Sequence, residues 1–423
     1  MTVCAVDAAP GEGGRTAHPG FAIAADGSYA ARLAPLGDGR GWIPERWTLD
    51  GPEPYAVPLP GPRPEGPGSE VLPLSDGRVL IRRGGPDRHH LALLYPAGPG
   101  TGELYLGAVE HGPLRLLPPA PHGMLAYALS PGEHGTTVWL VHGGPRGPEP
   151  VARVPGRCSG GLWLDRAGRL LALDRTDASG RTKTVAVDLE RGGEVSPLLQ
   201  ITDDSDDRLL LADPDSGLLL VRSDAPGEAR LGWGVLGSHR PVRFPDALRP
   251  PGVALTPFAV QPGQALDPEG CAVALRVDGP NGTWVAVWRP LQRALRHLAA
   301  PPGWVRGAGL WTADGELRLP YTGGQAPCGL ARIAWPCPEP GASSRPVPGP
   351  GREPSPHAFP GPVPRPRGER PAAPEAPRGA AGPEGAPAPA AEPLGPPAGR
   401  LLPFRPVPLQ QAPLGQNHAE RRS

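Results

Sequence analysis

The chain has 423 residues, of which 61 are glycine and 65 are proline, more than twice the ordinary share of these two residues. So many helix-breaking residues exclude a helical bundle or a coiled coil, and no apolar run approaches the roughly 18 residues that a membrane-spanning helix needs. The 42 basic and 42 acidic residues cancel, so the charge gives no indication of nucleic-acid or anionic-lipid binding. Composition alone points to no specific activity.

Arginine supplies almost all of the basic charge, because Lys183 is the only lysine. Arginine, alanine, glycine and proline have GC-rich codons, so the bias is typical of a high-GC genome such as that of an actinobacterium. Phosphate-binding P-loops and Schiff-base enzymes both need a lysine, and no glycine-rich loop precedes Lys183. We therefore expect neither chemistry.

Residues 20–335 show the pattern of short β-strands throughout. Apolar runs rich in valine, leucine and tryptophan alternate with turns of glycine, proline and aspartate, as in 161–165, 169–174 and 184–188. This alternation is typical of strands joined by tight turns. No segment predicts a helix longer than two turns.

One turn motif recurs seven times: an apolar residue, a short turn that usually contains aspartate or proline, a glycine, and a new apolar run. The first copy is Ala25-Asp26-Gly27-Ser28-Tyr29. Each glycine is predicted to take a positive φ in a tight hairpin between two strands, which aspartate or asparagine only partly tolerates. The predicted turn glycines lie 48 residues apart on average. They are Gly27, Gly77, Gly132, Gly168, Gly217, Gly270 and Gly315.

A period of about 40–50 residues, with four short strands in each repeat, is typical of a β-propeller. A single blade cannot bury both of its faces, whereas a ring of seven buries a continuous core between neighbouring blades. The sequence therefore predicts an all-β, seven-bladed β-propeller of four-stranded blades over residues 1–337, with 2–6 closing the ring against the last blade. The alternative, a pair of β-sandwiches, does not explain seven similar turns.

With this strand–turn–glycine repeat, residues 20–335 resemble the WD-repeat and TolB-like propellers. The resemblance implies a propeller fold and a binding function. The chain contains no Gly-His…Trp-Asp signature, no kelch Gly-Gly with its spaced tyrosine and tryptophan, and no sialidase Asp-box. The resemblance therefore brings no catalytic residues with it.

The composition changes near Pro336. Of the 86 residues in 338–423, 24 are proline, so this segment buries too little apolar surface to offset the entropy of ordering it. We expect a disordered tail with polyproline II character. Its segment 401–414 is apolar and free of acidic residues, which favours docking into an aromatic groove, although low complexity from codon bias is the alternative. The candidate contact residues are Leu401, Phe404, Leu409 and Leu414.

The cysteines are scattered, without the spacing of a zinc site or of a disulfide framework, so we expect free thiols. A pair between Cys328 and Cys337 is the alternative. The N-terminal residues lack a basic stretch followed by a long apolar one, which predicts a cytoplasmic protein. The five cysteines are Cys4, Cys158, Cys271, Cys328 and Cys337.

The chain was searched for catalytic patterns. No Gly-x-Ser-x-Gly elbow is present, and the run 158–161 (Cys-Ser-Gly-Gly) predicts a glycine-rich entry to a strand. His89 and His90 are adjacent and point to opposite sides of a strand, so they do not bind one metal together. An alternative is a cation site at the central channel, formed by His111, His122, His134 and His142.

The densest acidic cluster is Asp203, Asp204, Asp206 and Asp207. It lacks the glycine and the distal glutamate of a calcium-binding EF-hand loop. We expect a solvated loop between blades, with a weak cation site as the alternative.

Tryptophans offer a further set of candidates. Most of the ten are expected to pack between blades, and Trp284 and Trp288 share one side of a strand. Trp42 and Trp304 lie in glycine- and proline-containing loops instead. These two are the candidate exposed, ligand-contacting rings.

Together these features favour a monomeric, non-catalytic propeller that binds a protein partner, without nucleic acid, membrane, metal or cofactor and with no catalytic residue assigned. The alternative is a propeller lyase or hydrolase with a cation or a histidine and aspartate site at the channel. A third reading is a chain with no selected partner.

Overall fold

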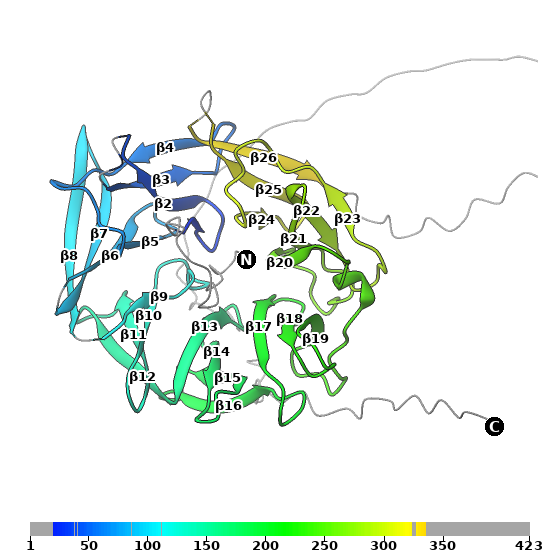
Figure 1. Cartoon of the computed structure of the whole chain (residues 1–423). Helices are drawn as coiled ribbons and strands as arrows, with labels where there is room; N and C mark the ends of the chain where they lie inside the picture. Colours follow the sequence, from blue (N-terminus) through cyan, green and yellow to red (C-terminus); the bar gives the residue numbers. More distant parts are fainter. Residues whose placement is uncertain are drawn as a thin grey trace, which may run out of the picture. The chain divides into compact units, whose positions relative to one another are not determined.

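The computed structural model describes residues 20–335 except 38, 40, 86, 111 and 324–326. These residues form seven antiparallel sheets in chain order, arranged around a common axis (Figure 1). We call them blades 1 to 7. The predicted all-β, seven-bladed propeller is confirmed, and the paired sandwich is wrong. The predicted closing segment 2–6, the thiols Cys4 and Cys337, and the tail with its candidate docking segment 401–414 lie outside the described residues.

Each of the first four blades contains four strands. In blade 1 these are β1 (Ala22–Ile23), β2 (Tyr29–Pro35), β3 (Trp42–Thr48) and β4 (Tyr55–Pro58). Blade 2 contains β5 (Glu70–Pro73), β6 (Val79–Gly84), β7 (Arg88–Ala97) and β8 (Gly100–Glu110). Blade 3 contains β9 (Arg115–Leu116), β10 (Ala126–Pro131), β11 (Gly135–His142) and β12 (Glu149–Pro155). Blade 4 contains β13 (Arg157–Trp163), β14 (Leu170–Thr176), β15 (Thr182–Asp188) and β16 (Glu194–Leu199).

The last three blades are less regular. Blade 5 contains β17 (Asp207–Ala212), β18 (Leu218–Ser223) and β19 (Arg230–Val235), and a bridge between Trp233 and Arg243 stands where a fourth strand would pair; the 3₁₀ helix η1 (Asp246–Leu248) follows. Blade 6 contains β20 (Ala254–Val260), β21 (Val273–Gly279), β22 (Gly282–Trp288) and β23 (Arg296–Leu298). In blade 7 the described strands are β24 (Leu310–Trp311), β25 (Glu316–Tyr321) and β26 (Gly329–Ala334). No helix in the described part of the chain is long and apolar enough to cross a membrane.

The hydrophobic core lies between the blades rather than at the centre of the ring. Seven buried clusters fill the seven interfaces between neighbouring blades. Between blades 5 and 6, for example, Trp233 and Trp288 meet edge to face with their ring centroids 6.4 Å apart. Between blades 7 and 1, Leu310 packs with Ile23 and Trp47. Each blade thus buries both of its faces against its neighbours. This burial on both sides explains why short strands of valine, leucine and alanine are enough to form a stable core.

Antiparallel pairing within each blade defines two ends of the ring. The turn from the first to the second strand and the turn from the third to the fourth strand lie at one end, which we call the upper face. The turns from the second to the third strand and the connections between blades lie at the other end, the lower face. The hydrogen bond from Leu291 N, after β22, to Glu269 O, before β21, joins two upper-face turns at 3.1 Å.

The first turns carry the predicted glycines, with two corrections. Gly27, Gly77, Gly168, Gly217 and Gly315 lie between the first and second strands of their blades with φ between 64° and 91°. Gly270 lies in the corresponding turn of blade 6 without a positive φ. The prediction for Gly132 is wrong: it lies in the lower-face turn between β10 and β11, and Gly123 (φ 71°) takes its place between β9 and β10.

Candidate functional site

The seven first turns contact one another and form a closed ring around the upper mouth of the channel. The backbone contact from Ser75 N to Gly123 O (2.9 Å) joins the turns of blades 2 and 3. Gln261 Nε2 donates to Ala313 O at 3.1 Å and joins blades 6 and 7. A Cβ at Gly77 would lie 3.0 Å from the Tyr29 ring of blade 1. We call this arrangement the turn ring.

Asp215 connects three blades of the turn ring. Its carboxylate binds the guanidinium of Arg166 from the first turn of blade 4 through Nε and Nη2, and it accepts a hydrogen bond from Gly263 N of blade 6 at 2.5 Å. The hydrogen bond from Arg166 is the main cause that lowers the pKa of Asp215, and burial opposes it. The ion pair therefore fixes the position of the Arg166 guanidinium at the channel mouth.

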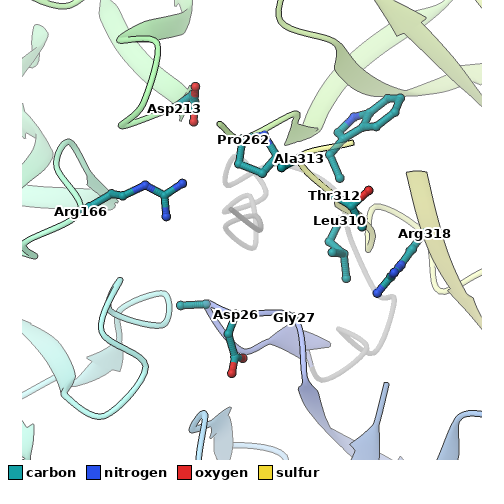
Figure 2. Close-up of a pocket in the computed structure, with 11 residues that line it drawn as sticks. Asp26, Gly27, Arg166, Asp213, Pro262, Leu310, Thr312, Ala313 and Arg318 are labelled. Carbon is teal, nitrogen blue, oxygen red and sulfur yellow. The ribbon is translucent and has the colours of Figure 1, made fainter. Parts of the chain in front are cut away.

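A pocket of about 310 Å³ opens inside the turn ring. It lies at the lower end of the size range of small-ligand sites. Its walls come from five blades, so it exists only in the assembled ring. Figure 2 shows its lining residues around the opening: Ala25, Asp26, Gly27, Arg166, Asp213, Pro262, Leu310, Trp311, Thr312, Ala313 and Arg318.

Asp213 is the most deeply buried carboxylate of this pocket, with 2% of its surface exposed. It ends the strand β17, and the turn that follows orients it, because Oδ2 accepts hydrogen bonds from Ser216 N (3.0 Å) and Ser216 Oγ (2.6 Å). Its other oxygen, Oδ1, is buried and has no hydrogen-bond partner. A buried acceptor without a donor costs free energy, so this oxygen is a point of unsatisfied hydrogen bonding among the described residues.

The other charged groups of the pocket have partners of different kinds. Arg318 donates from Nε to Glu316 Oε1 at 2.6 Å, as Arg166 does to Asp215. Among the described residues, the Asp26 carboxylate accepts hydrogen bonds only from Ser28, whose backbone N (3.1 Å) and Oγ (2.7 Å) are the donors. Each arginine is therefore neutralised by a carboxylate, whereas Asp26 has neutral partners.

The upper face also bears several of the exposed large hydrophobic side chains. Leu266 is 95% exposed and lies in the long first turn of blade 6, where it is the only non-glycine residue with a positive φ (58°) in the described part of the chain. Leu291, 65% exposed, lies in the β22–β23 turn of the same face. Met124 lies in the first turn of blade 3, and Tyr55 and Tyr95 lie on strands within three residues of an upper-face turn. Leu104 and Tyr105 lie in the middle of β8, at the outer edge of blade 2.

The two tryptophans predicted as exposed are not exposed. Trp304 is buried, donates from Nε1 to Ala308 O at 2.8 Å and packs against Phe258 at a centroid distance of 5.5 Å. Trp42 is half-buried at the start of β3 and packs on the cluster between blades 1 and 2. The expectation was wrong for two reasons: Trp42 begins a strand rather than lying in a loop, and the loop of Trp304 folds back onto the interface between blades 6 and 7.

The histidines predicted to converge at the channel lie at different ends of the ring. His122 contacts the first turn of blade 4 on the upper face, whereas His134 lies in the β10–β11 turn of the lower face. His142 ends β11, and burial is the main cause that lowers its pKa; His111 is not described. In the described residues no three histidine, cysteine, aspartate or glutamate side chains are placed to hold a metal ion together.

The acidic cluster is only partly a solvated loop. Asp203 and Asp204 are exposed, but Asp207 is fully buried at the lower face between blades 4 and 5. Its carboxylate accepts hydrogen bonds from Lys183 Nζ (2.8 Å), Ser223 Oγ (2.6 Å) and Ile201 N (2.9 Å). The ammonium group of the only lysine of the chain thus binds a carboxylate for which the sequence analysis predicted solvent or a bound metal cation.

The described thiols are free and unreactive in character. Cys158 and Cys271 are buried, and Cys328 is half-buried. Burial raises the pKa of all three, to about 12 for Cys271 and Cys328. The thiolate, which is the nucleophile, is therefore disfavoured at neutral pH.

Several solved structures are similar to this chain at low sequence identity. No family model and no curated protein matches the chain. A structure from a study of two prolyl endopeptidases is 15% identical, covers 74% of this chain and 46% of its own, and gives a TM-score of 0.46. The propeller domain of the Trilobed protease from Pyrococcus furiosus is 10% identical (74% and 93% covered, TM-score 0.45), and TolB from Acinetobacter baumannii is 12% identical (72% and 80% covered, TM-score 0.37). The chain thus spans about half the length of the endopeptidase.

Proposed function

We propose that this protein is a non-catalytic binding module and that a protein partner docks on its upper face. The observation that supports this proposal is the distribution of exposed apolar side chains. Of the seven large hydrophobic side chains that the described residues expose, Met124, Leu266 and Leu291 lie in upper-face turns. Tyr55 and Tyr95 lie on strands within three residues of such a turn, whereas Leu104 and Tyr105 lie in the middle of β8 at the outer edge of blade 2. Exposed apolar surface that gathers on one side of a protein is typical of an interaction site.

Leu266 strengthens this assignment. A leucine with positive φ is strained by about 1–2 kcal/mol, and full exposure of its side chain gains nothing in stability. Residues that keep both features cluster at functional sites, where the surroundings hold them in place. Leu291 lies on the neighbouring turn, and the Leu291 N to Glu269 O bond ties the two turns together.

Docking on the upper face also gives the pocket a role. An interface needs a buried anchor side chain surrounded by contacts that exclude water. The pocket inside the turn ring is a cavity that can receive such a side chain from the partner. The alternative, a channel enzyme with a histidine-bound cation, has no supporting arrangement among the described residues, since His122 and His134 lie on opposite faces.

Affinity capture with mass spectrometry from the native host tests the proposal. The test bait carries Leu266→Asn and Leu291→Asn, and the matched control carries His134→Asn and Arg181→Asn, two exposed positions on the lower face. Full-length baits and baits that end at Cys337 are compared in parallel.

We expect a partner that binds the wild type and the control but is lost from the Leu266 and Leu291 variant. Retention of every partner by that variant contradicts the proposal. Loss of the partner only when the bait ends at Cys337 moves the function to the segment 401–414.

A further inference from the structure

We propose that the pocket of the turn ring receives a cationic side chain, a lysine or an arginine, that the docked protein partner supplies. This inference rests on the proposed function, because it identifies what the partner brings to the upper face. Its basis is the unpartnered buried oxygen of Asp213 together with the charges around it.

Asp213 Oδ1 requires a hydrogen-bond donor that the described residues do not provide. The residue is 98% buried by the surrounding fold, while Oδ2 is already held by Ser216. A carboxylate with one satisfied oxygen and one empty one gains most from an N–H donor that also carries positive charge, because charge-assisted hydrogen bonds are about twice as strong as neutral ones.

The charges around the pocket favour a cation over an anion. Arg166 uses both Nε and Nη2 on Asp215, and Arg318 uses Nε on Glu316, so each arginine already has a carboxylate partner. After these pairs are counted, Asp26 and Asp213 are carboxylates without a described ion pair, although Asp213 also interacts electrostatically with Arg166. The pocket therefore carries an excess of negative charge.

The dimensions of the pocket fit one side chain rather than a folded segment. About 310 Å³ is close to the minimum for small-ligand sites. Leu310, Pro262 and Ala313 line one side of the pocket, and Figure 2 shows Asp213 and Asp26 on opposite sides of the opening. An apolar wall in the same pocket as the Asp213 carboxylate suits the aliphatic stem and charged head of lysine or arginine, and the apolar residues of the upper face then contact the surface around that side chain.

Titration of the full-length protein with capped amino acids tests the inference. The probes are N-acetyl-arginine amide and N-acetyl-lysine amide, with N-acetyl-norleucine amide as the uncharged counterpart of lysine and N-acetyl-glutamate amide as the anion. Binding is measured by calorimetry and by ligand-observed NMR. The variants are Asp213→Asn and Asp26→Asn, and the matched control is Asp204→Asn, which removes the same charge from an exposed position of the lower-face connection between blades 4 and 5.

We expect saturable binding of the cationic probes and none of the other two. Asp213→Asn is expected to weaken binding about tenfold or more, and Asp26→Asn less, while Asp204→Asn stays within about twofold of the wild type. A melting temperature of Asp213→Asn at or above that of the wild type establishes that the variant is folded. Equal binding of norleucine amide, binding of the glutamate probe, or unchanged affinity in Asp213→Asn would each overturn the inference.

The two proposals fail separately. If the Leu266 and Leu291 variant loses its partner but the cationic probes do not bind, the upper face remains a docking surface and the cation pocket is wrong. If the probes bind through Asp213 while that variant keeps every partner, the pocket remains and the docking proposal is wrong.

Discussion

The buried ion pair between Lys183 and Asp207 gives the sharpest test of how blades 4 and 5 are joined. Lys183→Met keeps the length of the side chain and removes its charge. The Asp207 carboxylate, with no exposed surface, then keeps its hydrogen bonds from Ser223 and Ile201 but loses its counter-ion. Removing one partner of a buried pair costs about 3–5 kcal/mol.

That cost converts into a measurable change of melting temperature. With an unfolding entropy of about 2.1 cal/mol/K per residue over some 310 ordered residues, 3–5 kcal/mol lowers Tm by roughly 5–8 °C. Thermal unfolding followed by circular dichroism measures it. Asp204→Asn, an exposed member of the same cluster, is the control and should shift Tm by less than about 1 °C. A Lys183→Met variant that melts within 1 °C of the wild type refutes the assignment, and a rise in Tm on adding calcium would restore the cation-site interpretation.

Three further predictions test the pH response, the turn ring and the strained turn. Burial raises the pKa of Asp174 to about 6, so the folded protein binds this proton more tightly than the unfolded chain. The free energy of unfolding of the wild type relative to Asp174→Asn should therefore fall by up to about 3 kcal/mol between pH 4 and pH 6.5, as urea midpoints at several pH values will show; a pH-independent difference contradicts this. Gly77→Ala should lower the free energy of unfolding, measured with urea, by more than Gly180→Ala does. Both glycines have φ above 80°, but only at Gly77 does the new Cβ meet a ring, that of Tyr29. Equal losses of stability in the two variants would mean that this contact in the turn ring contributes nothing. Leu266→Asn, which relieves a strained φ, should be as stable as the wild type or up to about 1 kcal/mol more stable, and a destabilised variant would show that Leu266 has a structural role.

The repeat was predictable because hairpin turns are local. A glycine after a short polar turn fixes the chain reversal within a few residues, so the positions of Gly27, Gly77, Gly168, Gly217 and Gly315 can be inferred without any knowledge of the fold. The failure at Gly132 has the same origin. Pro131-Gly132 is also a good local turn, and nothing in the local sequence distinguishes a turn of the upper face from one of the lower face.

Interactions between distant segments were not predictable in this way. Asp207 is buried because Lys183, 24 residues earlier, and Ser223, 16 residues later, converge on it. Trp304 is buried because its loop returns to Phe258. The rarity of lysine was a usable signal, since a single lysine in an arginine-rich chain points to a site where a compact ammonium group is needed.

The pocket could not be predicted from the sequence for a further reason. Asp213 begins an Asp-Pro-Asp-Ser-Gly turn, and Asp267 begins a similar Asp-Pro-Glu-Gly turn, yet only Asp213 ends with an unpartnered buried oxygen at the channel mouth. The role that we propose for Asp213 requires that Arg166, from another blade, pairs with Asp215 instead. The different partners of these two carboxylates, which lie two residues apart, are set only when the ring of blades is complete.

The same architecture separates the sources of stability from the surface to which we assign the proposed binding function. Stability comes from the seven interfaces between blades, where every buried cluster joins two neighbouring sheets. The upper-face turns lie at the ends of these interfaces, so a strained residue such as Leu266 or an unpartnered oxygen such as that of Asp213 costs one or two kcal/mol without opening a core cluster. A surface that tolerates such costs is free to carry recognition residues. Substitutions in these turns should therefore change binding far more than they change Tm, whereas substitutions between blades should do the reverse.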